Sequence, residues 1–92
     1  MRRSGGSSGQ WAIQVGAFAA EGQAHAAVTS AREEARDTLG GGRTLVASVR
    51  QARGTLYRAR VVGLSRESAV DACKKLSHGH ANCIVLSPEA QS

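Results

Sequence analysis

The chain has 92 residues and a formal net charge of +5, from 12 basic and 7 acidic side chains. This length supports one small domain with a modest core. The positive charge favours an anionic partner, such as nucleic acid, acidic lipid or a polysaccharide that carries carboxylates. No apolar stretch is long enough to cross a bilayer and no secretory signal segment precedes Trp11, so we expect no membrane insertion from this chain.

Residues 1–10, MRRSGGSSGQ, are rich in glycine and serine and contain no apolar residue after Met1. A segment of this composition cannot offset its ordering entropy, so we expect a flexible linker or an added leader. The folded domain is predicted over residues 11–88, and residues 89–92 are expected to form a C-terminal tail.

In the first half of the domain the sequence pattern predicts a strand, a helix and a hairpin. Alternating apolar and polar residues predict a strand over residues 11–18. A proline-free, alanine-rich amphipathic helix follows over residues 21–39, and Gly40-Gly41-Gly42 is expected to end it. Two further alternating segments, residues 44–50 and 55–62, are joined by a short connection and predict an antiparallel hairpin.

The second half adds one helix and one strand. Ser65 is a suitable N-cap for the helix, whose apolar stripe consists of Ala69, Ala72, Cys73 and Leu76. Residues 83–86 predict the fourth strand, and Pro88 closes the domain. The order β-α-β-β-α-β predicts an α+β fold of the RNP or ferredoxin-like type, in which two helices cover one face of a four-stranded antiparallel sheet. The other face is left open.

The third strand carries two arginines that are predicted to lie on this open face. Arg58 and Arg60 share one side of the strand, because the apolar Ala59 between them should point at the helices. The first and third strands are neighbours in this topology, so Gln14 is expected beside the arginines, with Gly16 also outward and permitting close approach of a ligand. The alternative is that the arginines only solvate an exposed sheet.

Two cysteines, Cys73 and Cys83, fall on the second helix and at the start of the fourth strand. A disulfide between them would contribute about 2–3 kcal/mol and would indicate an oxidising compartment. Two buried free thiols in a cytoplasmic protein are the alternative. A structural zinc site with His78 and His80 is a third possibility, although the spacing C-x4-H-x-H-x2-C matches no usual zinc motif.

No residue set favours catalysis. The glycine run at residues 40–42 lacks the Lys-Ser/Thr ending of a phosphate loop, and Ser65 is better used as a helix cap than as a nucleophile. His25 lies among alanines without an evident partner. We therefore expect a binding module that is not an enzyme and that needs no cofactor or metal.

Two motifs, WAIQVGAF at residues 11–18 and LYRARVVG at residues 56–63, lie about forty residues apart. Together with the paired cysteines, they resemble the SPOR (sporulation-related repeat) domain over about residues 11–88. The version with Arg-Ala-Arg and two cysteines is most similar to C-terminal domains of proteobacterial D-Ala-D-Ala carboxypeptidases.

The resemblance implies a monomeric domain that binds denuded peptidoglycan glycan strands across its sheet and localises a parent protein to the division septum, in the periplasm. It implies glycan binding by Gln14, Arg58 and Arg60. For Phe18 and Tyr57, ligand contact and packing at the sheet rim remain alternatives.

Two other functions fit parts of the pattern. RNA-recognition motifs share this topology and bind single-stranded RNA, but their third strand carries an aromatic-rich signature that TLYRARVV lacks. A protein-docking module would use an exposed apolar sheet edge, for which Val46 and Ile84 are the candidates.

Overall fold

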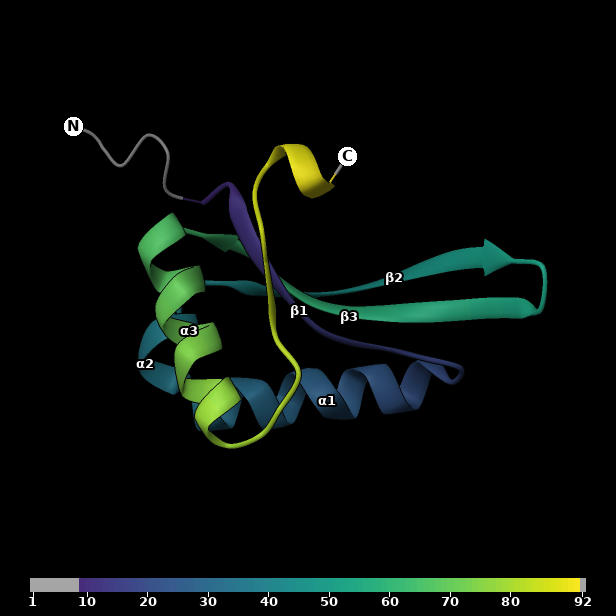
Figure 1. The fold of residues 1–92 in the computed structure, drawn as a ribbon, viewed down its shortest axis with the longest axis horizontal. Helices are drawn as coiled ribbons and strands as arrows, with labels where there is room; N and C mark the ends of the chain where they lie inside the picture. Colours follow the sequence, from purple (N-terminus) through teal and green to yellow (C-terminus); the bar gives the residue numbers. More distant parts are fainter. Residues whose placement is uncertain (1–8, 92) are drawn as a thin grey trace.

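The computed structural model describes residues 9–91, which form a sheet covered by helices on one side (Figure 1). The elements in chain order are β1 (Trp11–Phe18), α1 (Glu21–Glu34), α2 (Arg36–Leu39), β2 (Arg43–Gln51), β3 (Gly54–Leu64), α3 (Arg66–His78), β4 (Ile84–Leu86) and the 3-10 turn η1 (Glu89–Gln91). All strand pairs are antiparallel, in the order β2-β3-β1-β4. The predicted α+β fold is confirmed, while most of the predicted leader lies outside the described residues.

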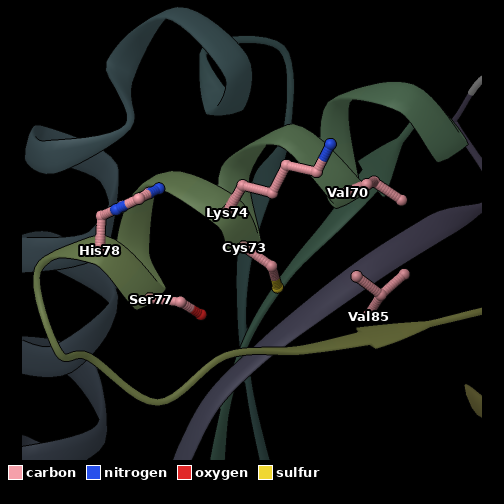
Figure 2. A pocket seen from close by; sticks show the side chains of 6 residues that line it. All are labelled: Val70, Cys73, Lys74, Ser77, His78 and Val85. Atoms are coloured by element: carbon pink, nitrogen blue, oxygen red, sulfur yellow. The ribbon is translucent and has the colours of Figure 1, made fainter.

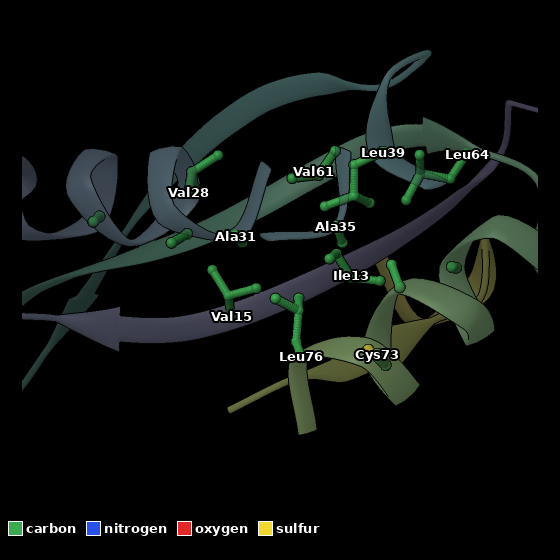
Figure 3. Packing of buried hydrophobic residues seen from close by; sticks show 14 residues of the cluster. Ile13, Val15, Val28, Ala31, Ala35, Leu39, Val61, Leu64, Cys73 and Leu76 are labelled. Atoms are coloured by element: carbon green, nitrogen blue, oxygen red, sulfur yellow. The ribbon is translucent and has the colours of Figure 1, made fainter. Parts of the chain in front are cut away.

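The core fills the space between the sheet and the helices (Figure 3). Its largest fully buried side chains are Ile13, Leu39, Leu76, Val28 and Val61. The predicted apolar stripe of α3 is buried here, and the Ser65 hydroxyl caps this helix by accepting a hydrogen bond from the Ser68 N–H at 3.0 Å. No helix among residues 9–91 has the length and apolar character of a membrane span.

The prediction of one continuous helix over residues 21–39 was wrong, because the helix is interrupted. Ala35 leaves the helical conformation (φ −120°, ψ 44°) and separates α1 from the single turn of α2. Ala35 and Leu39 are both fully buried, so the apolar periodicity continues across the break and gives no sign of it. The fourth strand also begins one residue later than expected, at Ile84.

Candidate binding face of the sheet

A hydrogen-bonded pair of polar side chains lies at the centre of the open face. Gln14 in β1 pairs in register with Arg60 in β3, and the Arg60 Nε–H donates to Gln14 Oε1 at 2.9 Å. Their chain neighbours Ile13 and Ala59 are fully buried in the helix-side core, so alternation turns Gln14 and Arg60 to the other face. The bond orients the guanidinium and leaves its terminal N–H groups available for a ligand.

Two exposed apolar residues extend this pair into a row across all four strands. Arg60 lies opposite Leu45 in β2, and Gln14 lies opposite Ile84 in β4. Leu45 is 43% exposed and Ile84 is 56% exposed, and they are the exposed large hydrophobic residues of the described chain. We call these four residues the central row. It spans about 14 Å, because neighbouring strands are about 4.8 Å apart.

The next row places a second arginine between small side chains. Arg58 lies opposite Ala17 in β1 and Ala47 in β2. Because both neighbours are alanines, they leave room around the Arg58 guanidinium. The structure therefore brings the predicted polar set, Gln14, Arg58 and Arg60, together on one face.

Positive charge on this face is not neutralised within the sheet. Burial, and to a smaller extent the nearby Arg58, lowers the pKa of Arg60 from its ordinary value. The four strands contain no acidic residue and carry the arginines Arg43, Arg50, Arg58 and Arg60. An anionic ligand would supply the missing countercharge.

A bulge in β1 removes Gly16 from the predicted patch. The register shifts between Gln14 and Gly16, so Gly16 pairs with the buried Ala59 and not with an outward residue. Its φ is 149°, and a Cβ built on it would lie 2.7 Å from Cζ of Phe18. The absence of a side chain at Gly16 makes room for the Phe18 ring, so the prediction that it faces a ligand on the open sheet was wrong.

The aromatic side chains also lie on the helix side of the sheet. Phe18 pairs with Tyr57, and both pack against the buried core. Trp11 packs there too, with the Arg66 guanidinium 5.8 Å from its ring centroid. For Phe18 and Tyr57 the structure shows packing at the sheet rim, and among residues 9–91 the open face has no aromatic ring.

The C-terminal turn limits the open face at the start of β1. In Figure 1, η1 and α3 lie on opposite sides of this end of β1. The Gln91 side-chain amide donates to the Gln10 carbonyl at 2.8 Å and fastens the turn there. By alternation, Ala12 points to the same face of β1 as Gln14. It is nevertheless fully buried, and it is not part of the helix-side core cluster. Along β1, the accessible part of the open face therefore begins at the central row.

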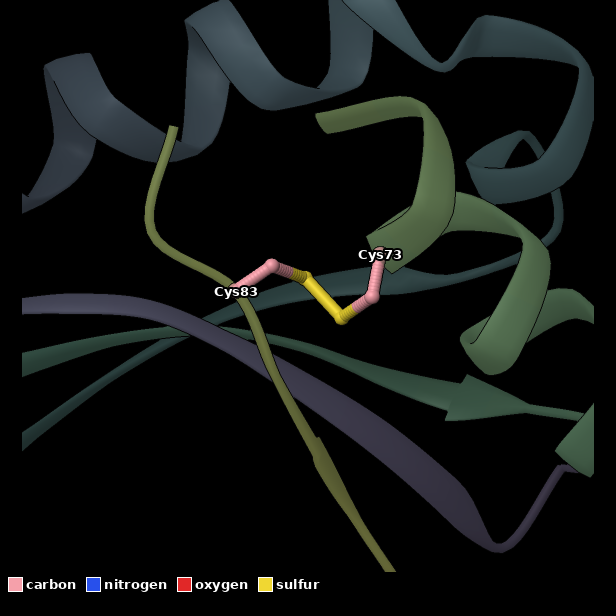
Figure 4. The surroundings of a disulfide bond; sticks show 2 residues. All are labelled: Cys73 and Cys83. Carbon is pink, nitrogen blue, oxygen red and sulfur yellow. A yellow bond between two sulfur atoms is a disulfide. The ribbon is translucent and has the colours of Figure 1, made fainter. Parts of the chain in front are cut away.

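Cys73 and Cys83 form a disulfide, with their Cα atoms 5.2 Å apart (Figure 4). The predicted pairing is present, and the two sulfurs that a zinc site would need are joined to each other. The bond links α3 to the residue directly before Ile84. It therefore helps to position one end of the central row.

Sequence reasoning missed Leu45, one of the two apolar ends of the central row. Leu45 and Val46 are adjacent and both apolar, so alternation alone does not say which one faces the helices. Val46 pairs with the buried Ala59 and packs against the core, which turns Leu45 outward. Of the two candidates for an exposed apolar edge, Val46 is therefore not exposed in this way, and Ile84 is exposed.

Comparisons with known proteins agree with this architecture. The family model of the SPOR domain matches residues 7–87. The crystal structure of the RlpA SPOR domain from Pseudomonas aeruginosa has a TM-score of 0.62 and 18% identity, covering 85% of this chain and 99% of that one. The solution structure of the peptidoglycan binding domain of the B. subtilis cell wall lytic enzyme CwlC has a TM-score of 0.58 and 21% identity, covering 94% and 96%.

At these identities the two structures show a shared fold. No curated protein matches the chain in sequence. Because the family model covers most of the sequence, the chain belongs to the SPOR domain family.

Proposed function

We propose that this domain is a non-catalytic module that binds peptidoglycan glycan strands on the open face of its sheet. The observation that carries the proposal is the Gln14–Arg60 pair beside Arg58, on a sheet whose strands hold no acidic residue. Membership of the SPOR family supports it, as does the fold shared with a domain described as peptidoglycan binding.

The chemistry of denuded glycan matches these side chains. Removing the stem peptide exposes the lactyl carboxylate of N-acetylmuramic acid, and a guanidinium can bind a carboxylate through two parallel hydrogen bonds. The Gln14 amide can both donate to and accept from acetamido groups and sugar hydroxyls. We therefore propose that the domain prefers glycan strands without stem peptides.

The ends of the central row would add apolar contacts. Leu45 and Ile84 are exposed on either side of the polar pair and can cover methyl groups and the apolar faces of sugar rings. With no aromatic ring available for stacking among the described residues of this face, we expect each site to bind with modest affinity.

The biological setting is also part of the proposal. A disulfide is typical of an oxidising compartment, which fits the periplasm or another part of the cell envelope. We propose that the module acts as a monomer and recruits a parent cell-wall enzyme, such as a D-Ala-D-Ala carboxypeptidase, to glycan exposed at the division septum.

Single-stranded RNA is the less favoured partner. RNA-recognition sheets bind bases by stacking them on aromatic side chains of the open face. Here Trp11, Phe18 and Tyr57 all pack on the helix side. A basic sheet without rings is better suited to the carboxylates and acetamido groups of a glycan.

Co-sedimentation with purified sacculi tests the proposal. We expect the domain to sediment more with amidase-treated sacculi than with untreated ones. Replacing both arginines, Arg58→Ala with Arg60→Ala, should weaken binding at least tenfold, because each charge-assisted hydrogen bond contributes about 1.5–3 kcal/mol. The matched control, Arg50→Ala with Arg53→Ala, removes the same charge near the hairpin turn and should bind normally.

Three results would contradict the proposal. Equal sedimentation with both kinds of sacculi would exclude the preference for denuded strands. Retained binding by the Arg58/Arg60 variant, with an unchanged circular dichroism spectrum, would exclude the open face. Binding to poly(U) RNA in preference to amidase-treated sacculi would favour the alternative partner.

A further inference from the structure

The outer edge of the sheet at β4 is unpaired. β4 hydrogen-bonds to β1 on one side, and no strand among residues 9–91 lies on its other side. In an edge strand, every second residue turns its N–H and C=O groups away from the sheet, where they can pair with another chain. The Gln91 side chain donates to the Leu86 carbonyl at 3.3 Å, so the C-terminal turn contacts the downstream end of β4.

A hollow of about 480 Å³ lies between this edge and α3, on the helix side of the sheet (Figure 2). It is lined by Val70, Cys73, Lys74, Ser77, His78 and Val85. The disulfide of Cys73 holds the two walls together by joining α3 to the residue before β4. An edge strand and an adjoining apolar floor therefore lie side by side.

The polar rim of this hollow is basic. Lys74 and His78 lie one turn apart on α3, and both are exposed. The acidic residues of α3, Glu67 and Asp71, line an adjoining hollow of about 210 Å³ toward the start of the helix, which shares Val70 with this one. At the end nearest His78 the lining holds Lys74 and His78 and no carboxylate, and the Glu34 carboxylate lies just beyond it, against Gly79.

The geometry points to a docking site for an extended acidic peptide segment of another protein, which adds to β4 as a fifth strand. In an added strand, alternate side chains point to the same face of the sheet. An apolar side chain would then cover Val70 and Val85, and an acidic side chain two positions away would reach Lys74 or His78. This site differs from the glycan site, since Val85 and Ile84 point to opposite faces.

A designed peptide, acetyl-Thr-Thr-Val-Thr-Glu-amide, tests the site by titration into ¹⁵N-labelled domain; its one glutamate lies two positions from the valine, and its other end, toward Glu67 and Asp71, carries no acidic side chain. We expect the amide signals of Ile84, Val85 and residues 74–78 to shift in a saturable way. A peptide with lysine in place of the glutamate, and one with proline in place of the third threonine, should each cause much smaller shifts. The first control reverses the charge, and the second removes a backbone donor.

Two lysine variants distinguish peptide binding at this site from general electrostatic attraction to the domain. Lys74→Glu should weaken peptide binding about five- to tenfold, because it replaces an attractive contact with a repulsive one. Lys75→Glu changes the charge equally but acts at a residue that lies 3.9 Å from Asp37 and does not line the hollow, so its binding should be nearly unchanged. Both variants should sediment normally with sacculi.

The inference would be overturned by shifts confined to the open face, by equal losses in both lysine variants, or by a lysine-containing peptide that binds as well as the acidic one. Since sacculus binding is measured on the same variants, failure of this site and failure of the glycan site give different results.

Discussion

A single extra residue in β1 decides which side chains reach the open face. Gln14 and Phe18 are four residues apart, so strict alternation would place both on the same face. The bulge between Gln14 and Gly16 reverses the alternation, so that Phe18 packs against the core while Gln14 stays outward beside Arg60. The bulge thus separates Gln14, which we propose binds glycan, from a packing side chain within one strand.

Gly16→Ala should destabilise the domain by about 1–3 kcal/mol, because the added Cβ meets the Phe18 ring and the positive φ strains any other residue. Urea unfolding followed by circular dichroism measures the change. The control is Gly22→Ala in α1, where a Cβ meets nothing within 4 Å; it should be neutral or stabilise by up to about 1 kcal/mol. Equal stability of Gly16→Ala and the unmodified domain would show that the bulge tolerates a side chain.

Local alternation predicted the direction of the two arginines correctly where the strand is regular. Arg58 and Arg60 flank the buried Ala59, so their direction follows from the three residues alone. Gly16 was misplaced, and the direction of Phe18 was left open, because a bulge depends on pairing with a strand forty residues away. Leu45 was missed for a similar reason, since only its pairing with Arg60 shows that it faces outward.

At the scale of elements, β4 is the weakest part of the sheet. It has three residues and pairs with β1 alone. The Cys73–Cys83 bond ties its start to α3, and this closed loop has a sequence separation of 10. The sequence predicted both partners of this bond because their elements are adjacent in the chain. The break at Ala35, between α1 and α2, was not predicted from the sequence. The buried positions keep helical spacing across the break, so the apolar pattern gives no sign of it.

Removing the bond through Cys73→Ala with Cys83→Ala should lower the free energy of unfolding by about 2–3 kcal/mol, as expected for a short cross-linked loop. Hydrogen exchange should accelerate most at Ile84–Leu86, because these residues lose their covalent attachment to α3. A phosphine reductant should destabilise the unmodified domain to a similar extent and leave the alanine variant unaffected. If exchange rises equally throughout the domain, the bond does not act mainly on β4.

At the scale of the whole molecule, charge is divided between the two layers. Six of the seven acidic residues, Glu21, Glu33, Glu34, Asp37, Glu67 and Asp71, lie in the helices, and Glu89 lies in η1, on the other side of β1 from α3. The strands hold four arginines and no carboxylate. The net charge of +5 is therefore unevenly distributed, because the strands contribute +4 whereas the helices, with five basic and six acidic side chains, contribute −1. An anionic polymer would be attracted to the sheet and away from the helices.

This division predicts a binding reaction that depends on salt. Raising ionic strength from about 50 to about 500 mM should weaken binding to amidase-treated sacculi several-fold, since the Debye length falls from about 14 Å to about 4 Å. Neutral chito-oligosaccharides have the acetamido groups but no lactyl carboxylate, so any binding to them should change little with salt. The Arg58→Ala, Arg60→Ala variant should lose most of the salt dependence along with its affinity. If neutral and carboxylated glycans respond to salt alike, the arginines do not bind carboxylates, and the central row recognises sugars through Gln14, Leu45 and Ile84 alone.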